Sequence, residues 1–514
     1  MRDKVTSVFW ITMIFAVLFI LWGVLFPENL GNMMDVTLQF FMTNFGWFYQ
    51  ITATLFLLFA VFLIFTRYGK IKLGKEEDRP EFKRPTWIAM LFSAGMGIGL
   101  LFFGVSEPIS HFANPPLLEQ GSTDDAAIMS LRYTYLHWGF HAWAIYASIA
   151  LALAYFKFRR GAPGLISATL KPLLGDKTNG WFGQAIDVIA VFATIFGVCA
   201  SLGLGATQIN GGLHYLTDIP NSFWIQVLII IIVTILFLIS AGTGLKKGIR
   251  YLSNANMALA VLLLIAMVVL GPTIFLLDLF TTTFGSYLQN LPQMGLRLAP
   301  FNPEDAEWFQ NWTIFYWAWW IAWAPFVATF IARVSKGRTV REFMIAVLIV
   351  PTLVCTFWFC VFGGTGIYLE YAQGLAVSEQ TLETALFYVF QHLPMSALLS
   401  IIALFLISTF FITSADSATY VLGLQTTKVG IEPPNAVKYG WGAVLALSAI
   451  VLLASGGLEA IQTTIIVSAF PLALVFLFML ASIWKAFRSE RKPKRKERRF
   501  RLRRRLKREQ IRPT

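Results

Sequence analysis

Charged residues are scarce in this chain of 514 residues: they make up 13% of it, whereas 57% of the residues are hydrophobic. The mean hydropathy is +0.65. A water-soluble fold could not bury so much apolar surface, so the composition excludes an ordinary soluble protein. The three cysteines are too few for a disulfide framework and lack the spacing of metal ligands. We therefore expect them to serve packing.

Motifs for chemistry on a substrate are also lacking. The sequence has no recognisable nucleophile–base pairing and no zinc motif. The glycine-rich stretch near residue 97 follows no strand and precedes no GK[ST], so it is not a nucleotide-binding loop. These absences argue against an enzyme, and against an ATP-driven pump formed by this chain alone.

Long apolar runs dominate what is present. Stretches such as 7–26, 223–241 and 257–277 have about the ~20 residues needed to cross a bilayer. The first run is full-length and lacks a small-residue cleavage site, so we expect it to remain as a span. We predict an all-α polytopic membrane protein with twelve spans. Their centres lie near residues 17, 57, 97, 145, 195, 231, 265, 322, 354, 408, 447 and 473.

Basic residues fall mainly on one side of these spans. With the N-terminus inside, 39 of the 41 Lys and Arg residues lie on inner segments, and only Arg132 and Arg297 lie outside. Both termini are therefore expected to be cytoplasmic. The net charge of +13 comes from residues 485–514, which hold 16 basic and 3 acidic side chains. Such a tail either anchors the topology or also binds anionic lipids of the inner leaflet, which are nearer to it than nucleic acid.

The spans divide into two N-terminal ones and two groups of five. Because five is odd, the second group must run with the opposite orientation to the first, as inverted repeats do. We expect the first helix of each five-helix repeat to supply the substrate site. The expected divisions are 1–86 (two spans and a basic linker), 87–277 (spans 3–7), 278–310 (an outer connection), 311–484 (spans 8–12) and 485–514 (the basic tail).

Five tryptophans occur within twelve residues of the eighth span: Trp312, Trp317, Trp319, Trp320 and Trp323. Tryptophan offers the best neutral π-face for a cation, and aromatic cages are the usual sites for quaternary ammonium groups. A cage inside the bilayer would let a permanent cation leave water without a counter-charge. The run therefore predicts transport of a quaternary amine.

Further aromatic residues occur in the fourth span, in YLHWGFHAWAIY. On one continuous helix, at ~100° per residue, Trp138, Tyr146 and Trp143 would form an arc of about 140°. Such an arc can complete a cage, with an interfacial aromatic belt as the alternative. His137 and His141 have the i, i+4 spacing of metal ligands or proton carriers, but we expect no acidic neighbour for them.

Alternating glycines mark the third span. Gly95, Gly97 and Gly99 would each cost a helix about 1 kcal/mol, so we expect an unwound or closely approached segment. Unwound backbone frees carbonyl oxygens that suit Na⁺, with close helix packing as the alternative. We expect Glu107 and Pro108 to end this span at the outer face.

Polar residues gather in the tenth span, in TFFITSADSATY. Thr413 and Ser414 either complete a sodium shell facing the glycine segment or bond back to their own helix. We expect Asp416 to be structural.

These motifs resemble the signature segments of the betaine/choline/carnitine transporter family. The likeness is carried by NWTIFYWAWWIAWAPFVATFIARVSKGRT, with GMGIG, GVSEP, HWGFHAWAIY and FFITSADS in the right order along the chain. It covers nearly all of the sequence except the detail of the tail. The resemblance implies twelve helices with two inverted repeats, alternating access, and a homotrimer with a cytoplasmic sensing tail.

The resemblance also implies roles for single residues. The family pattern includes a second sodium site with a threonine at the position where this chain has Val198. The substrate would meet the box residues Trp138, Trp143, Tyr146 and Trp320, with Trp319 and Trp323 along the inner pathway. Sodium would meet Ser93, Met96, Phe410, Thr413 and Ser414 at one site, and Thr194 and Phe326 at the second.

Two departures within the resemblance narrow the expected substrate and coupling ion. Choline-type members tend to carry an acidic residue where this chain has Gly99, which favours a zwitterion. The sodium-independent carnitine exchanger has a methionine at the position of Val327 and an arginine in place of sodium. Residues 251–278 of this chain contain no basic side chain. We expect sodium symport of glycine betaine or a related osmolyte across a bacterial plasma membrane, with Na⁺ as coupling ion and no other cofactor. The alternatives are a proton-coupled choline carrier, a carnitine/betaine exchanger and an aromatic-lined cation channel.

Overall fold

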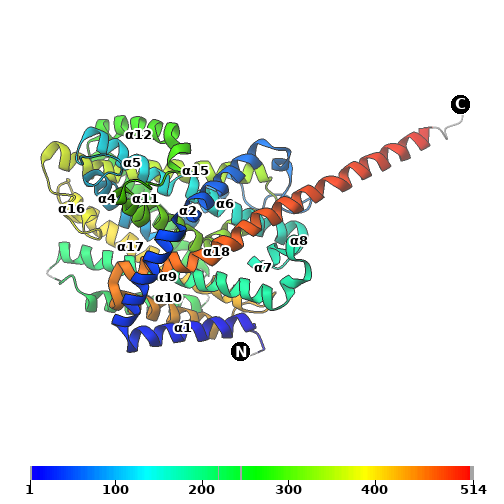
Figure 1. The fold of residues 1–514 in the computed structure, drawn as a ribbon, viewed down its shortest axis with the longest axis horizontal. Helices are drawn as coiled ribbons and strands as arrows, with labels where there is room; N and C mark the ends of the chain where they lie inside the picture. The colour runs from blue at the N-terminus through cyan, green and yellow to red at the C-terminus, as the bar shows by residue number, and fades with distance from the viewer. Residues whose placement is uncertain (1–2, 96, 218, 244–245, 510–514) are drawn as a thin grey trace.

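The chain is almost entirely helical (Figure 1). The computed structural model describes residues 3–95, 97–217, 219–243 and 246–509. Within these ranges no β-strand forms, and two isolated bridges join Val5 to Thr427 and Lys72 to Thr339. The elements are α1 (Ser7–Leu25), α2 (Pro27–Phe65), η1 (Arg67–Lys70), α3 (Arg84–Gly95), α4 (Ile98–Ala113), α5 (Asp124–Trp138), α6 (Phe140–Ala154), η2 (Tyr155–Arg159), α7 (Ile166–Thr169), α8 (Lys171–Leu174), η3 (Gly175–Asn179), α9 (Trp181–Leu216), α10 (Phe223–Thr243), α11 (Lys246–Leu270), α12 (Thr273–Met294), α13 (Pro303–Phe309), η4 (Gln310–Ile314), α14 (Phe315–Val334), α15 (Val340–Gln373), α16 (Ala385–Gln391), α17 (Ser396–Thr426) and α18 (Asn435–Glu509).

Ten helical segments among the described residues are long and apolar enough to cross a membrane. Two features explain the difference from twelve expected spans. α18 contains two of those spans, joined at a kink where Gly456 and Gly457 have non-helical backbone angles. The third span is split into α3 and α4, each shorter than a full crossing. The predicted all-α polytopic membrane fold is confirmed, while its division into inverted repeats stays a prediction.

The spans differ sharply in how far they are buried inside the molecule. In the most apolar 18-residue window, 94% of the residues are buried for 124–159 and 78% for 303–334, against 17% for α10. α10 exposes a row of isoleucines that includes Ile231, Ile235 and Ile239. Lipid tails are as apolar as these side chains, so such a surface can face lipid but not water. The spans that carry the predicted aromatic site are therefore the ones shielded from lipid.

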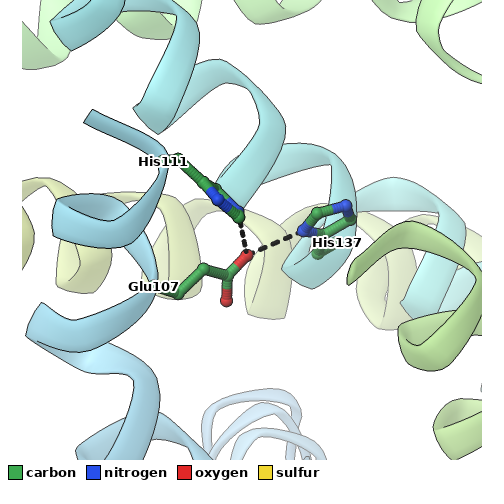
Figure 2. A group of neighbouring side chains, drawn as sticks. All are labelled: Glu107, His111 and His137. Carbon is green, nitrogen blue, oxygen red and sulfur yellow. Dashed lines mark hydrogen bonds and ion pairs between the residues drawn. The ribbon is translucent and has the colours of Figure 1, made fainter. Parts of the chain in front are cut away.

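α4 continues past the residues that were expected to end it. The prediction that Glu107 and Pro108 terminate the third span is wrong, because α4 runs on for more than a turn with Pro108 inside it. Packed membrane helices tolerate the backbone bond that proline removes. α15 packs closely against α4 here, because a Cβ at Gly363 of α15 would lie only 2.3 Å from Pro108 Cγ. Glu107 is thus held inside the bundle, facing His111 and His137 (Figure 2).

Much of the outer connection, 278–310, is helical as well. It contains most of α12 and the whole of α13. The Tyr287 hydroxyl of α12 accepts a hydrogen bond of 3.1 Å from the backbone N–H of Phe140, the first residue of α6. The connection therefore braces the junction between α5 and α6.

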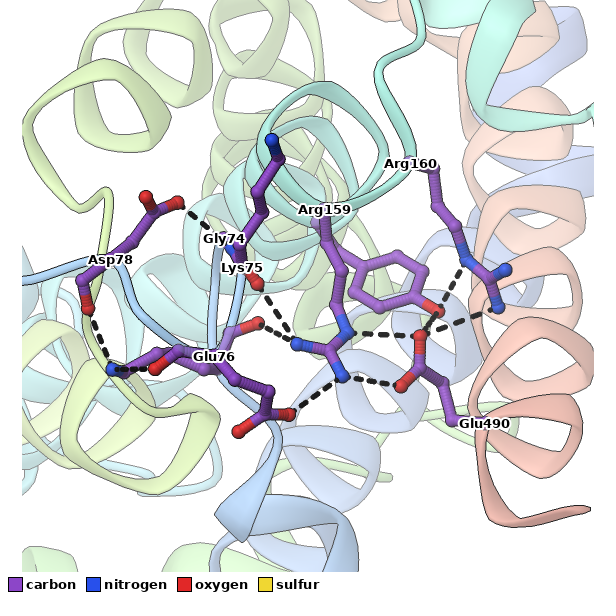
Figure 3. Close-up of polar contacts among 9 residues, drawn as sticks. Gly74, Lys75, Glu76, Asp78, Arg159, Arg160 and Glu490 are labelled. Atoms are coloured by element: carbon purple, nitrogen blue, oxygen red, sulfur yellow. Dashed lines mark hydrogen bonds and ion pairs between the residues drawn. The ribbon is translucent and has the colours of Figure 1, made fainter. Parts of the chain in front are cut away.

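An ion-pair network ties α18 to two other segments where the helix leaves the bundle (Figures 1 and 3). Arg159, at the end of η2, donates to Glu490 through two bonds: Nε to Oε1 at 2.9 Å and Nη2 to Oε2 at 2.7 Å. It also donates to the Gly74 carbonyl oxygen at 2.9 Å and pairs with Glu76 at 3.0 Å. Arg160 pairs with Glu490 at 3.4 Å. The first residues of the basic tail are therefore held against the bundle by the ion pairs of Glu490.

Replacing Glu490 with Gln should destabilise the protein, because Arg159, whose side chain is 13% exposed, would lose its bidentate partner. We expect a loss of about 1–2 kcal/mol, since a partly exposed pair contributes less than a fully buried one. The measurement is the melting temperature of the purified protein in detergent. The matched control is Glu77→Gln, at an exposed position next to Glu76 in the segment between η1 and α3. Equal melting temperatures for the two variants would contradict the prediction.

Candidate functional site

Four predicted box residues form one aromatic cluster in the centre of the bundle. Trp138, Trp143, Tyr146 and Trp320 are each at most 7% exposed. The ring centroids of Trp138 and Trp320 lie 5.1 Å apart at 84°, and those of Tyr146 and Trp320 lie 5.5 Å apart at 89°. Trp143 meets Tyr146 at 5.8 Å and 80°. Each ring thus contacts the next edge to face, and the cluster joins α5, α6 and α14.

A helix break sets the direction of Trp138. Trp138 is the last residue of α5, and Gly139 has φ −99° and ψ −134° before α6 begins. The arc predicted for one continuous helix is therefore wrong, because only Trp143 and Tyr146 share a helix. A Cβ at Gly139 would lie 2.4 Å from the Tyr135 carbonyl oxygen, so a larger residue does not fit this junction.

Of the two tryptophans predicted to line the pathway, one joins the cluster. Trp319 stacks on Trp320, with centroids 5.8 Å apart at 19°, and lies 6.1 Å from Trp138. Trp323 turns toward α9, where its indole N–H donates to the Gly197 carbonyl oxygen at 2.5 Å. The same α14 surface therefore serves both the cluster and the contact with α9.

The other two tryptophans of the run lie around the cluster. Trp317 is fully buried, and its indole N–H donates to Gln50 Oε1 of α2 at 2.8 Å. Trp312, in η4, packs against His111 with ring centroids 4.6 Å apart. These contacts give both indoles a packing role.

The third span is broken at its glycines. α3 ends at Gly95, and α4 follows Gly97, whose backbone is extended at φ −153° and ψ −172°. A Cβ at Gly99 would lie 2.8 Å from Trp138 Cη2 and 2.9 Å from Trp319 Cη2. The absence of a side chain at Gly99 therefore allows α4 to approach two walls of the cluster.

The residues predicted for the first sodium site come from α17 and the glycine segment. Met96 lies outside the described residues, and so does the side chain of Ser93. The Thr413 hydroxyl donates to a carbonyl oxygen of its own helix at 2.9 Å and lies 3.3 Å from the Phe410 carbonyl oxygen. Ser414, the next residue, is half-buried. In this conformation Thr413 bonds back to its own helix, which is the alternative that the sequence left open.

The remaining polar and ion-site candidates have other neighbours. Thr194 is fully buried and donates to a carbonyl oxygen of α9 at 2.7 Å, one turn before Val198. Phe326 is half-buried on α14. Asp416 accepts a hydrogen bond of 3.1 Å from the Ser240 hydroxyl of α10, a contact that joins two helices.

Glu107, to which the sequence analysis assigned no role in the site, has a fully buried carboxylate that lies directly behind the cluster. Glu107 Oε2 accepts hydrogen bonds from the Trp138 indole N–H at 2.7 Å and from the Tyr316 hydroxyl at 2.5 Å. Glu107 Oε1 lies 2.7 Å from His137 Nδ1 and 3.3 Å from His111 Nε2 (Figure 2). One acidic side chain thus connects α4, α5 and α14.

The expectation that His137 has no acidic neighbour is therefore wrong, because its partner comes from a different helix. The ligand atoms of Glu107, His111 and His137 lie within 4.8 Å of one another. Within the described ranges, these three residues are the group whose ligand atoms are close enough to hold a metal. His141 is not part of it and packs 5.3 Å from the Trp317 ring. The available signal was a carboxylate and a histidine at i, i+4 within an apolar span.

Two polar atoms of the cluster have no hydrogen-bond partner among the described residues. They are the Tyr146 hydroxyl and the Trp319 indole nitrogen. Buried donors are normally paired, so an unpaired donor at a candidate site indicates a place for a ligand acceptor.

Comparison with known proteins decides the class. The model of the betaine/carnitine/choline transporter family, BCCT, matches residues 7–492. The chain belongs to this family. It is 53% identical to the glycine betaine transporter OpuD of Bacillus subtilis over 96% of both chains.

Other members of the BCCT family are also similar. A probable glycine betaine transporter of Desulfitobacterium hafniense is 43% identical, over 95% of this chain and 98% of the relative. An ectoine/hydroxyectoine transporter of Virgibacillus pantothenticus is 41% identical, over 92% and 95%. As a BCCT member the chain is a multi-pass membrane transporter and not an enzyme.

Placing a methyl group at Gly99 should disturb the cluster, because its Cβ would overlap the Trp138 and Trp319 rings. We expect Gly99→Ala to lose about 1–3 kcal/mol of stability through overpacking and to change the intrinsic tryptophan emission. Thermal unfolding followed by fluorescence measures both effects. Gly97→Ala is the control, since a Cβ there would meet no atom within 4 Å. The same response from both variants would show that the close approach at Gly99 is not the cause.

Proposed function

We propose that this BCCT transporter imports glycine betaine or a related quaternary-ammonium osmolyte by sodium symport, using alternating access, for osmoprotection. One observation carries the proposal: the buried cluster of Trp138, Trp143, Tyr146 and Trp320, drawn from three helices at the centre of the bundle. The names of the similar transporters, which refer to glycine betaine and ectoine, support the same class of substrate.

The cluster suits a trimethylammonium group for a simple electrostatic reason. Neutral indole and phenol rings attract a cation through their π-faces, at ~0.5–2 kcal/mol per ring. Four rings near the upper value supply about 8 kcal/mol, which corresponds to a Kd of about 1 μM. Because the rings contact one another in this structure, the substrate must part them on entry, and such a rearrangement is consistent with alternating access.

Two features favour a zwitterion over choline. Gly99 stands where choline-type members tend to carry an acidic residue, so no carboxylate at this position is available to pair directly with a substrate that lacks one of its own. The Tyr146 hydroxyl and the Trp319 indole N–H find no acceptor among the residues that the structure describes, and the carboxylate of a betaine is a suitable acceptor for both. Choline has no carboxylate to offer them.

Sodium is the coupling ion that we propose. The extended backbone at Gly97 supports this, because an interrupted membrane helix exposes carbonyl oxygens to an ion. In a sodium-bound state, the Thr413 hydroxyl would exchange its bond within α17 for the ion, with Ser414 beside it. Thr194 and Phe326 are candidates for a second site, although Val198 departs from the family pattern there.

The proposal extends to the surroundings of the transporter. We place it in a bacterial plasma membrane with both termini in the cytoplasm, following the distribution of its basic residues. α18 continues as a helix into the basic tail, where we propose contacts with anionic lipids. A homotrimer is the expected assembly from the family resemblance.

Uptake of radiolabelled glycine betaine into proteoliposomes should require an inward sodium gradient. Trp320→Leu should abolish this uptake, because it removes the ring that contacts both Trp138 and Tyr146. The control is Trp181→Leu, at a side chain that is 78% exposed and far from the cluster in sequence.

Each alternative predicts a different result in the same assay. Uptake driven by a proton gradient in potassium buffer would favour a proton-coupled carrier, and uptake that needs only internal substrate would favour an exchanger. Non-saturating, voltage-dependent flux would favour a cation channel.

Tyr146→Phe should weaken glycine betaine binding about tenfold, because one charge-assisted hydrogen bond contributes about 1.5 kcal/mol while the aromatic wall stays in place. Choline binding should change less than twofold, since choline has no carboxylate. Isothermal titration of purified protein with both ligands measures the two constants. Equal losses for both ligands would assign the hydroxyl a packing role instead.

A further inference from the structure

Glu107 receives hydrogen-bond donors on every side. Its two oxygens meet the Trp138 indole N–H, the Tyr316 hydroxyl, His137 Nδ1 and His111 Nε2, at 2.5–3.3 Å. Trp138 can only donate, and the other three groups carry a proton that they can point at the carboxylate. The side chain has no exposure to solvent.

The arrangement of protons favours the ionised form of Glu107. The second nitrogen of His137 lies 2.9 Å from the Thr313 hydroxyl. Because this hydroxyl can donate to that nitrogen, the His137 proton is free to sit on Nδ1, facing Glu107. His111 Nδ1 has no hydrogen-bond partner in the part of the chain that the structure describes. Placing the His111 proton on Nε2 therefore avoids a buried unpaired donor. Four donors then converge on one acceptor-only carboxylate.

This carboxylate has no cationic partner with a permanent charge. Among the described residues, the only basic groups within ion-pair distance of Glu107 are the two histidines. A buried anion inside a membrane protein is costly unless a positive charge compensates it, and such residues usually serve function. Under the proposed function, the cation that approaches this region in the transport cycle is the ammonium group of the substrate.

We propose that Glu107 is the counter-charge of the aromatic box and the residue that positions Trp138. This inference rests on the proposed function. Glu107 contacts the back of the box, not the substrate, so it acts through Trp138 and Tyr316. A carboxylate that accepts from an indole N–H shifts electron density into the ring, which strengthens the attraction of the ring face for a cation.

The same network also sets the geometry of the opposite wall. The Trp320 indole N–H donates to the backbone carbonyl oxygen of His137 at 2.8 Å. Tyr316 stacks on His137, with ring centroids 4.8 Å apart at 19°. Trp138 and Trp320 are therefore both held by residues that contact Glu107. This makes the carboxylate a determinant of specificity for positively charged groups.

The test compares two ligands of equal shape in wild type and Glu107→Gln. Glycine betaine carries the quaternary nitrogen, and tert-butylacetate is its carbon isostere without the positive charge. Competition binding to purified protein, followed by intrinsic tryptophan fluorescence, gives the preference of each variant for betaine over the isostere. We expect Glu107→Gln to reduce this preference about tenfold, as removal of one nearby charge in a partly screened interior implies.

A collapsed box would behave differently, because it would lose affinity for both ligands alike and leave the preference unchanged. That result would overturn the proposal. Glu370→Gln is the matched control: its carboxylate, near the end of α15, accepts two bonds from Ser378 in the loop that follows this helix, away from the box. The preference should stay at the wild-type value.

A second variant covers the case in which Glu107→Gln does not fold. Trp138→Phe keeps an aromatic wall but removes the N–H that meets Glu107, so we expect a preference reduced about threefold. A wild-type preference in this variant would then overturn the proposal. If wild-type protein binds no betaine, the proposed function itself fails; if it binds betaine and neither variant alters the preference, only the role of Glu107 fails.

Discussion

The hydrogen bonds to Glu107 are the interaction on which the geometry of the site depends. They join α4, which carries the carboxylate, to Trp138 at the end of α5 and to Tyr316 in α14. Because the carboxylate is fully buried, each of these bonds forms where water cannot replace it. The consecutive helices α4 and α5 are thereby fixed against α14, which lies much further along the chain, and two walls of the aromatic cluster are fixed with them.

Helix breaks provide the second condition for the site. The chain interrupts its helices at Gly139, directly after Trp138, and at Gly97, two residues before the Gly99 that approaches Trp138 and Trp319. Non-helical backbone at membrane depth is tolerated only where protein surrounds it. The surrounding spans meet this need: helices with the site are largely buried, while α10 and α11 present apolar faces outward. The outer helices thus make the irregular centre possible.

Much of the fold and part of the site could be predicted from local sequence. Apolar runs of sufficient length predicted the spans, because crossing a bilayer demands one kind of segment. The cluster of Trp320 with Trp138 was predicted from composition and resemblance. The position of Glu107 was not, because proline after an acidic residue usually marks the end of a helix. Its partners His137 and Trp138 lie on another helix, and no periodicity reports contacts between helices.

The sequence by itself determined the class of the protein: a helical, multi-pass member of the BCCT family with an aromatic-rich eighth span. Those properties follow from hydrophobicity and from residue types at fixed spacing, which act locally along the chain. Only the tertiary structure decided which indoles face one another, since Trp319 joins the cluster while Trp323 turns to Gly197. It also decided that Glu107 lies behind the box. The physical reason is that side-chain direction and buried charge pairing depend on how separate helices pack, which local pattern does not encode.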